Sequence, residues 1–195
     1  MADSEISTGN ITVGAPTEGG CVWTSFADAP SFPADAATAM KTLTDFVSLG
    51  EISENGYTET ESLSTTNHKG WHNKVVLTSI DEDTKTYKIE FLEVNRAAVA
   101  KLRYGVSNVT VDENGKIKSI TPGTYDGKAR PLIIDELMSN GDLRRTIVRK
   151  AVISSFDDVT HQNGSLLTFG MEFTVNEPDD GSKAIETLFA TPATA

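Results

Sequence analysis

The chain has 195 residues, enough for one substantial core, although only 38% are hydrophobic and 7% aromatic. Its formal net charge of −11 argues against binding to duplex DNA through phosphate contacts, and no apolar run approaches the roughly 18 residues of a membrane span. The single cysteine, Cys21, cannot close a disulfide within the chain, and the polar first residues carry no secretory signal, so we expect folding in a cytoplasm.

The charges are unevenly distributed along the chain. Residues 1–66 hold 10 acidic residues and 1 basic residue, residues 67–150 hold 11 and 15, and residues 151–195 hold 7 and 1. This pattern suits a soluble, self-repelling monomer whose basic middle contacts acidic arms of another copy.

The first third of the chain contains a polar arm, a strand and a helix. Residues 1–19 are rich in Gly, Ser and Thr, and a strand follows over 20–26. Asp35 is placed to cap a helix over 36–48 that ends before Gly50, with Met40, Leu43 and Val47 on one face.

Most of the remaining chain has the pattern of antiparallel strands. In 165–175, apolar side chains at alternate positions point one way and polar ones the other. Asn-Gly pairs at 55, 114, 140 and 163, and Asp-Gly at 126 and 180, are typical of hairpin turns. Further strands are predicted over 74–80, 84–91, 108–112, 116–120, 131–138 and 143–154, with the acidic run 81–83 as a turn. The pattern predicts a mainly β protein, an antiparallel sandwich or barrel.

Two further segments interrupt these strands. Asn95 is placed to cap a second short helix over 96–103, with Val99 and Leu102 inward and Gly105 after it. Residues 58–70 have few apolar groups and read as a polar loop. We therefore divide the chain into an arm (1–19), a sandwich domain (20–176) with an assembly loop (58–72), and a C-terminal arm (177–195).

A search for catalytic or metal-binding residues finds no convincing set. His68 and His72 stand four apart, but Gly70 argues against a helix and no third ligand is evident. Residues 123–128 depart from a phosphate-binding loop in the glycine spacing and in Ala129 after the lysine. We expect no enzyme activity, no cofactor and no metal.

Large side chains in unusual places are instead candidates for contacts between subunits. Tryptophan often anchors interfaces, and basic residues on one strand can meet acidic arms of a neighbour. The predicted interface residues are Trp23, Phe26, Trp71, His72, Arg144, Arg145 and Arg149.

An ordered set of segments gives the chain a family resemblance. The segments are FPADAATAM (32–40), SLGEISENGYT (48–58), KGWHNKVV (69–76), YKIEFLEVNRAAVAKLRYG (87–105), RRTIVRKAVIS (144–154) and LLTFGMEFTV (166–175). Over about residues 22–176 the chain resembles the major tail tube proteins of long-tailed, siphovirus-type phages that infect actinobacteria.

The resemblance implies a β-sandwich subunit of the virion tail, assembled in the host cytoplasm. Hexameric rings of such subunits stack into a tube for genome ejection, with loops and arms binding the next subunit and ring. The implied partners are other copies of the chain, the tape measure protein and DNA in the lumen, and the tail terminator and distal tail proteins at the ends. Two alternatives stay open: a sandwich binding module, such as a capsid decoration protein or adhesin, and the tube of a contractile injection system.

Overall fold

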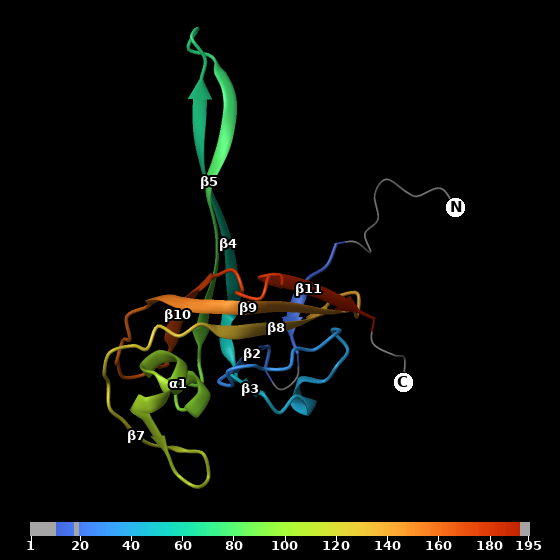
Figure 1. The fold of residues 1–195 in the computed structure, drawn as a ribbon. Helices are drawn as coiled ribbons and strands as arrows, with labels where there is room; N and C mark the ends of the chain where they lie inside the picture. The colour runs from blue at the N-terminus through green and yellow to red at the C-terminus, as the bar shows by residue number, and fades with distance from the viewer. Residues whose placement is uncertain (1–10, 18–19, 192–195) are drawn as a thin grey trace.

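A computed structural model describes residues 11–17 and 20–191, and strands dominate this part of the chain (Figure 1). The strands are β1 (Gly14–Pro16), β2 (Val22–Ser25), β3 (Phe46–Ser48), β4 (Ile52–Lys69), β5 (Val75–Phe91), β6 (Val109–Val111), β7 (Ile117–Ile120), β8 (Arg130–Met138), β9 (Leu143–Phe156), β10 (Phe169–Val175) and β11 (Ile185–Ala190). The helical segments are α1 (Ala97–Tyr104) and the 3-10 turns η2 (Met40–Thr42) and η3 (Val106–Asn108). No helix among the described residues is long and apolar enough to span a bilayer.

One antiparallel sheet contains nearly all of these strands. Its order is β3-β2-β8-β9-β10-β5-β4, with β1 added to β8 and β11 added to β9, while β6 and β7 form a separate hairpin. The first half of β9 pairs with β8 and β11, and its last residues pair with β10. Because of this change of partner, β5 and β10 pack across the main core from β2 and β8. This arrangement confirms the predicted antiparallel sandwich.

The main core lies between these parts of the sheet and under α1. The alternation predicted for 165–175 is present, because Phe169, Met171 and Phe173 are buried. On the neighbouring strand Tyr87, Ile89 and Phe91 are buried as well, and α1 covers them with Val99 and Leu102. The predicted second helix is thus confirmed, one residue later than expected, with Arg96 at its N-cap in place of Asn95.

A second, smaller core lies on the other face of β8 and β9. Ile133 and Ile147 pack there against Met40 and Phe46, whereas the adjacent Leu132 faces the main core. The segment between β2 and β3 forms this second layer, so β8 is buried on both faces. This explains the uninterrupted apolar run in its sequence.

The helix predicted over 36–48 is wrong. Asp35 caps no helix: its Oδ1 accepts hydrogen bonds from the Thr38 hydroxyl (2.8 Å) and backbone nitrogen (2.6 Å), which close a local turn and lower the pKa of Asp35. Only the 3-10 turn η2 follows, and Phe46–Ser48 then pairs with β2 as strand β3. Phe46 and Val47 favour strand pairing, and the sheet offers them a partner that a helix would give up.

The polar loop predicted over 58–70 and the turn predicted over 81–83 are also wrong. Residues 52–69 and 75–91 form one long hairpin of β4 and β5, with a tip closed by a hydrogen bond from the Gly70 nitrogen to the Lys74 oxygen (2.9 Å). Threonine-rich polar strands pair as well as apolar ones, because the backbone supplies the hydrogen bonds. The acidic run continues β5 through an irregularity in register near Asp81.

Only some of the Asn-Gly and Asp-Gly pairs form the hairpin turns that the sequence predicts. Asn114-Gly115 and Asn140-Gly141 form the tight turns of β6–β7 and β8–β9, as predicted. Gly56 has a φ of 69° inside β4, where the register against β5 shifts between Ile52 and Tyr57, so this pair marks a bulge. Beyond Asp180-Gly181, residues 185–190 pair with β9, which extends the sheet past the boundary that we placed at residue 176.

Candidate assembly surfaces

The β4–β5 hairpin extends far from the body of the molecule (Figure 1). Its outer part, residues 62–84, contributes no residue to the buried core. It nevertheless carries large hydrophobic side chains that are more than half exposed: Leu63, Trp71, Val75, Val76, Leu77 and Ile80. Isolated exposed apolar residues are ordinary, but six of them on one projecting arm indicate a contact surface.

These apolar residues occupy both faces of the hairpin. The register pairs Leu63 with Asp83, Thr65 with Ile80, and His68 with Leu77. Since side chains alternate along a strand, Leu63 and Ile80 lie on one face and Leu77 on the other. Neither face has a second layer within the described chain, and a two-stranded ribbon buries little by itself. The arm therefore has two faces that another molecule can cover.

The hairpin tip presents two of the predicted interface residues. Trp71 is 100% exposed, and His72 is exposed beside it. The turn is held by hydrogen bonds from Gly70 to Lys74 and from Asn73 to Gly70, and Asn73 adopts a φ of 59°. A fully exposed indole on an ordered turn is a suitable anchor for a partner surface.

The other two aromatic candidates lie in the body of the subunit, away from the tip. Trp23 is half-buried against the smaller core, and its indole Nε1 is buried with no hydrogen-bond partner among the described residues. Phe26 packs on the main core, with the Arg130 guanidinium 4.9 Å from its ring centre. The structure therefore does not bring the aromatic candidates together, and a contact between subunits through Trp23 or Phe26 stays a prediction.

The basic set on β9 is paired within the chain. Arg144 contacts Glu136 at 3.4 Å and Arg149 contacts Glu186 at 2.9 Å. Arg145 is only 3% exposed and forms a two-point ion pair with Asp135. Each cation already has its anion in the same subunit, so little unbalanced positive charge is left for a neighbour's acidic arm.

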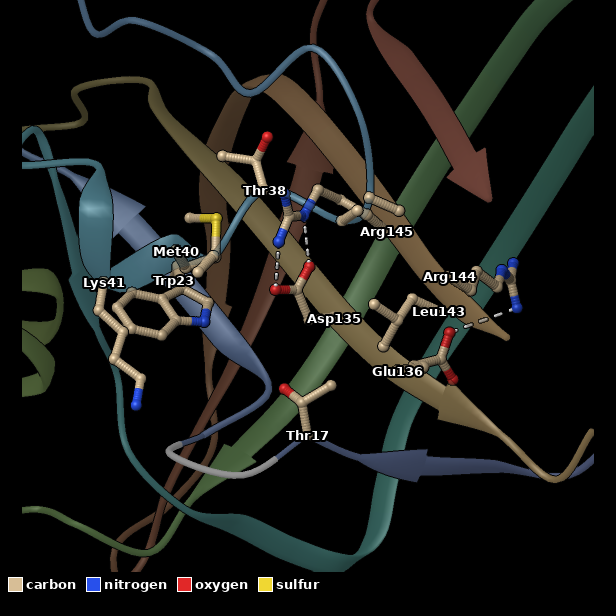
Figure 2. A pocket seen from close by; sticks show the side chains of 13 residues that line it. Thr17, Trp23, Thr38, Met40, Lys41, Asp135, Glu136, Leu143, Arg144 and Arg145 are labelled. Carbon is tan, nitrogen blue, oxygen red and sulfur yellow. Dashed lines mark hydrogen bonds and ion pairs between the residues drawn. The ribbon is translucent and has the colours of Figure 1, made fainter. Parts of the chain in front are cut away.

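A cavity of about 440 Å³ opens beside this ion pair (Figure 2). Residues 36–41 form one wall, and Trp23 and Leu143 form others. Figure 2 shows the Asp135–Arg145 pair at its centre and the Arg144–Glu136 pair at its side. Both of its carboxylates are tied to arginines, which leaves an apolar hollow without a reactive group.

Among the described residues, the histidines and acidic residues form no metal-binding group. His68 Nε2 lies 3.1 Å from the Ser79 hydroxyl across the hairpin, and His72 stands at the tip. Within residues 11–17 and 20–191, no group of three or more His, Cys, Asp and Glu side chains is placed to hold a metal ion. Burial raises the pKa of the Cys21 thiol to about 11, so it is a poor nucleophile.

Sequence reasoning missed most of the apolar residues on the hairpin. Val75, Val76, Leu77 and Ile80 fall in the strand predicted over 74–80, which we had assigned to the sandwich domain and not to an assembly surface. A usable signal was present: the segment that precedes 74–80, residues 58–69, is polar, so a hairpin of these two segments would leave the apolar residues of 74–80 uncovered.

Comparison with known proteins gives one clear finding. A family model described as phage tail tube protein matches residues 13–194, nearly the whole chain. A search of curated proteins found no match.

Proposed function

Because the chain belongs to the phage tail tube protein family, we propose that it forms hexameric rings that stack into a tube through which the viral genome is ejected. Membership alone makes it a structural protein of the virion tail, not an enzyme, and one that self-assembles into a tube with other tail proteins. The proposal concerns the ring, its stacking and the passage of DNA.

The observation that carries this proposal is the β4–β5 hairpin with its uncovered apolar residues. A contact that joins different patches of identical subunits builds a ring where its rotation closes, and an open filament where it does not. An arm that reaches from one subunit onto the next is such a contact. We assign the hairpin to binding between rings.

Within a ring, the ends of the sheet provide the joint. β4 and β3 are the end strands of the sheet order, and such edges pair readily with a neighbouring chain. Residues 1–19 and 177–195 are proposed to reach neighbouring subunits, although part of the first segment also forms β1 and part of the second forms β11. The tape measure protein and DNA are the proposed occupants of the lumen, and tail terminator and distal tail proteins the partners at the tube ends.

Negative-stain electron microscopy of purified protein over a concentration series tests the proposal. We expect tubes of uniform diameter with a ring repeat, and a variant without the outer hairpin that stays monomeric. In that variant Asn-Gly replaces residues 62–84 and joins Glu61 to Lys85, which are paired in the native register. Since the removed residues contribute nothing to the core, its thermal unfolding should match that of the intact chain. Persistent monomers of the intact chain at high concentration would contradict the proposal.

A further inference from the structure

A second cavity lies on the body of the subunit, and its lining residues differ from those of the cavity in Figure 2. Its volume is about 540 Å³, and it forms where the segment after β2, the start of β8 and the β10–β11 loop meet. Three prolines, one aromatic ring and three alanines supply its apolar walls: Pro30, Pro131, Pro178, Phe32, Ala27, Ala29 and Ala129. Rigid proline surfaces and an aromatic ring suit a flat aromatic side chain.

The lining of this cavity carries an excess of negative charge. Two cations line it, but Arg149 is paired with Glu186 and Lys150 with Asp179. Two further lining carboxylates, Asp28 and Asp180, have no ion-pair partner among the described residues. An occupant with an apolar centre and positive charges beside it would match this arrangement.

The hairpin tip has this chemistry. Trp71 is fully exposed, and Lys69 and Lys74 flank it at the two ends of the turn, with no ion-pair partner in the described chain. A tryptophan buries about 150–250 Å² when it docks, more than most other side chains. The tip therefore offers one large apolar group between two uncompensated positive charges.

We propose that the Trp71 tip of one copy inserts into the cavity lined by Pro30, Pro131 and Pro178 of a second copy. The inference deepens the proposed tube assembly and rests on it. Lys69 and Lys74 then approach Asp28 and Asp180.

The geometry of the subunit favours a second copy over the tip's own body. The outer strands run from about residue 60 to residue 69, a length of roughly 33 Å at the usual rise per residue. Figure 1 shows that this ribbon points away from the body throughout. The tip cannot fold back without breaking the paired ribbon, whereas a neighbouring subunit can lie within its reach.

The cavity of Figure 2 is the poorer receptor for this tip. Lys41, Arg144 and Arg145 line it, against the two carboxylates of Asp135 and Glu136. Both carboxylates are already engaged by arginines, so Lys41 would face the lysines of the tip. This difference in charge provides a matched control for an experiment.

Directed disulfide formation tests the inference. The native Cys21 does not interfere, because it is buried and its raised pKa keeps the thiol unreactive. A His72→Cys chain carrying a size tag is mixed with an untagged Ala29→Cys chain, assembled into tubes and oxidised mildly. The control mixture replaces Ala29→Cys with Ala37→Cys, an alanine that is also exposed and lines the other cavity. We expect disulfide-linked tagged–untagged dimers in the first mixture, at least about tenfold more abundant than in the control.

Charge exchange provides an independent measurement. Lys69→Glu with Lys74→Glu should raise the protein concentration needed for tubes by more than about tenfold, as should Asp28→Lys with Asp180→Lys. All four changes in one chain should restore tube formation to within about threefold of the native level.

The outcomes separate this inference from the proposed function. Tubes that form normally, but cross-link no better at Ala29 than at Ala37 and gain nothing from the charge exchange, overturn the docking inference alone. Absence of tubes from the unmodified chain overturns both.

Discussion

Asp135 on β8 and Arg145 on β9 form a two-point ion pair beneath the surface, with Nε to Oδ1 at 2.7 Å and Nη2 to Oδ2 at 2.8 Å. The remaining Nη1 of Arg145 donates to the backbone oxygen of Asp35 at 2.9 Å. One buried guanidinium thus ties the β8–β9 ladder to the segment that covers the smaller core. Asp35 and Arg145 are 110 residues apart in the sequence. Their hydrogen bond therefore fixes the segment between β2 and β3 on the sheet, and does not merely stabilise a local turn.

Arg145→Ala should destabilise the subunit by about 3–5 kcal/mol, because it leaves the Asp135 carboxylate buried without its partner. Arg144→Ala, one residue earlier, should cost at most about 1 kcal/mol, since its pair with Glu136 is partly exposed. Chemical denaturation of the two purified variants measures the difference. Equal destabilisation by both substitutions would contradict the structural role of the buried pair.

Cys21 should react slowly with thiol reagents while the protein is folded. Burial raises its pKa from 9.0 to about 11, so at pH 8 the thiolate fraction falls about a hundredfold. The neutral thiol therefore favours the folded state below pH 9, and that contribution is lost as the pH rises through about 11. Labelling kinetics in native buffer and in denaturant measure the effect, with His72→Cys as the exposed control. Equally fast labelling of both native proteins would show that Cys21 is accessible.

Sequence patterns predicted what depends on neighbouring residues and failed where distant segments decide. The alternation around Phe173 and the turn at Asn140-Gly141 are local, and both were predicted correctly. Residues 36–48 have helical spacing, but β2 recruits Phe46 into a strand, a partner that no local pattern reveals. The hairpin was missed because polar strands that only pair with each other lack the apolar alternation by which strands are recognised.

The candidate site residues show the same contrast between local sequence patterns and contacts made by distant segments. Trp71 was singled out because a tryptophan in polar surroundings is unusual, and it is indeed fully exposed. Arg145 was chosen as a surface cation because its neighbours on the strand are basic. Its burial depends on Asp135, which lies across the β8–β9 ladder, and on the layer anchored at Asp35.

Trp71→Ala should impair polymerisation without affecting folding. The side chain is fully exposed, so thermal unfolding should not change. An anchor residue contributes upward of about 2 kcal/mol to an interface, which corresponds to a rise of roughly 30-fold in the concentration needed for tubes. Leu166→Ala, at another exposed apolar residue (78%), is the matched control and should assemble normally. A Trp71→Ala protein that unfolds early yet forms tubes at the native concentration would contradict the assignment.

Hydrogen exchange should distinguish the two ends of the hairpin. Near the body, Tyr87 and Ile89 are in the core, and their amides should be strongly protected. Amides of the outer part, residues 62–84, should exchange fast in the monomer, because an isolated two-stranded ribbon is marginally stable. Assembly should then slow them by at least about tenfold. Equal protection along the whole hairpin in the monomer would mean that the arm is rigid before it binds.

The inner wall of the assembled tube should carry more aspartate and glutamate than lysine and arginine. DNA has to slide through the tube, and each cation that contacts a phosphate adds a salt-dependent attraction that would slow it. The net charge of −11 per subunit makes an acidic wall easy to supply, and repulsion between like charges keeps the duplex away from it. The basic residues best suited to bind DNA lie on β9: Arg144, Arg149 and Lys150. Each is paired with a carboxylate of the same subunit, so even on the inner wall they would present little free positive charge. A structure of the assembled tube decides the matter through the charged side chains that line its bore. If lysines and arginines outnumber the acidic residues there, the wall holds DNA rather than letting it slide, and the tube would work by a different principle.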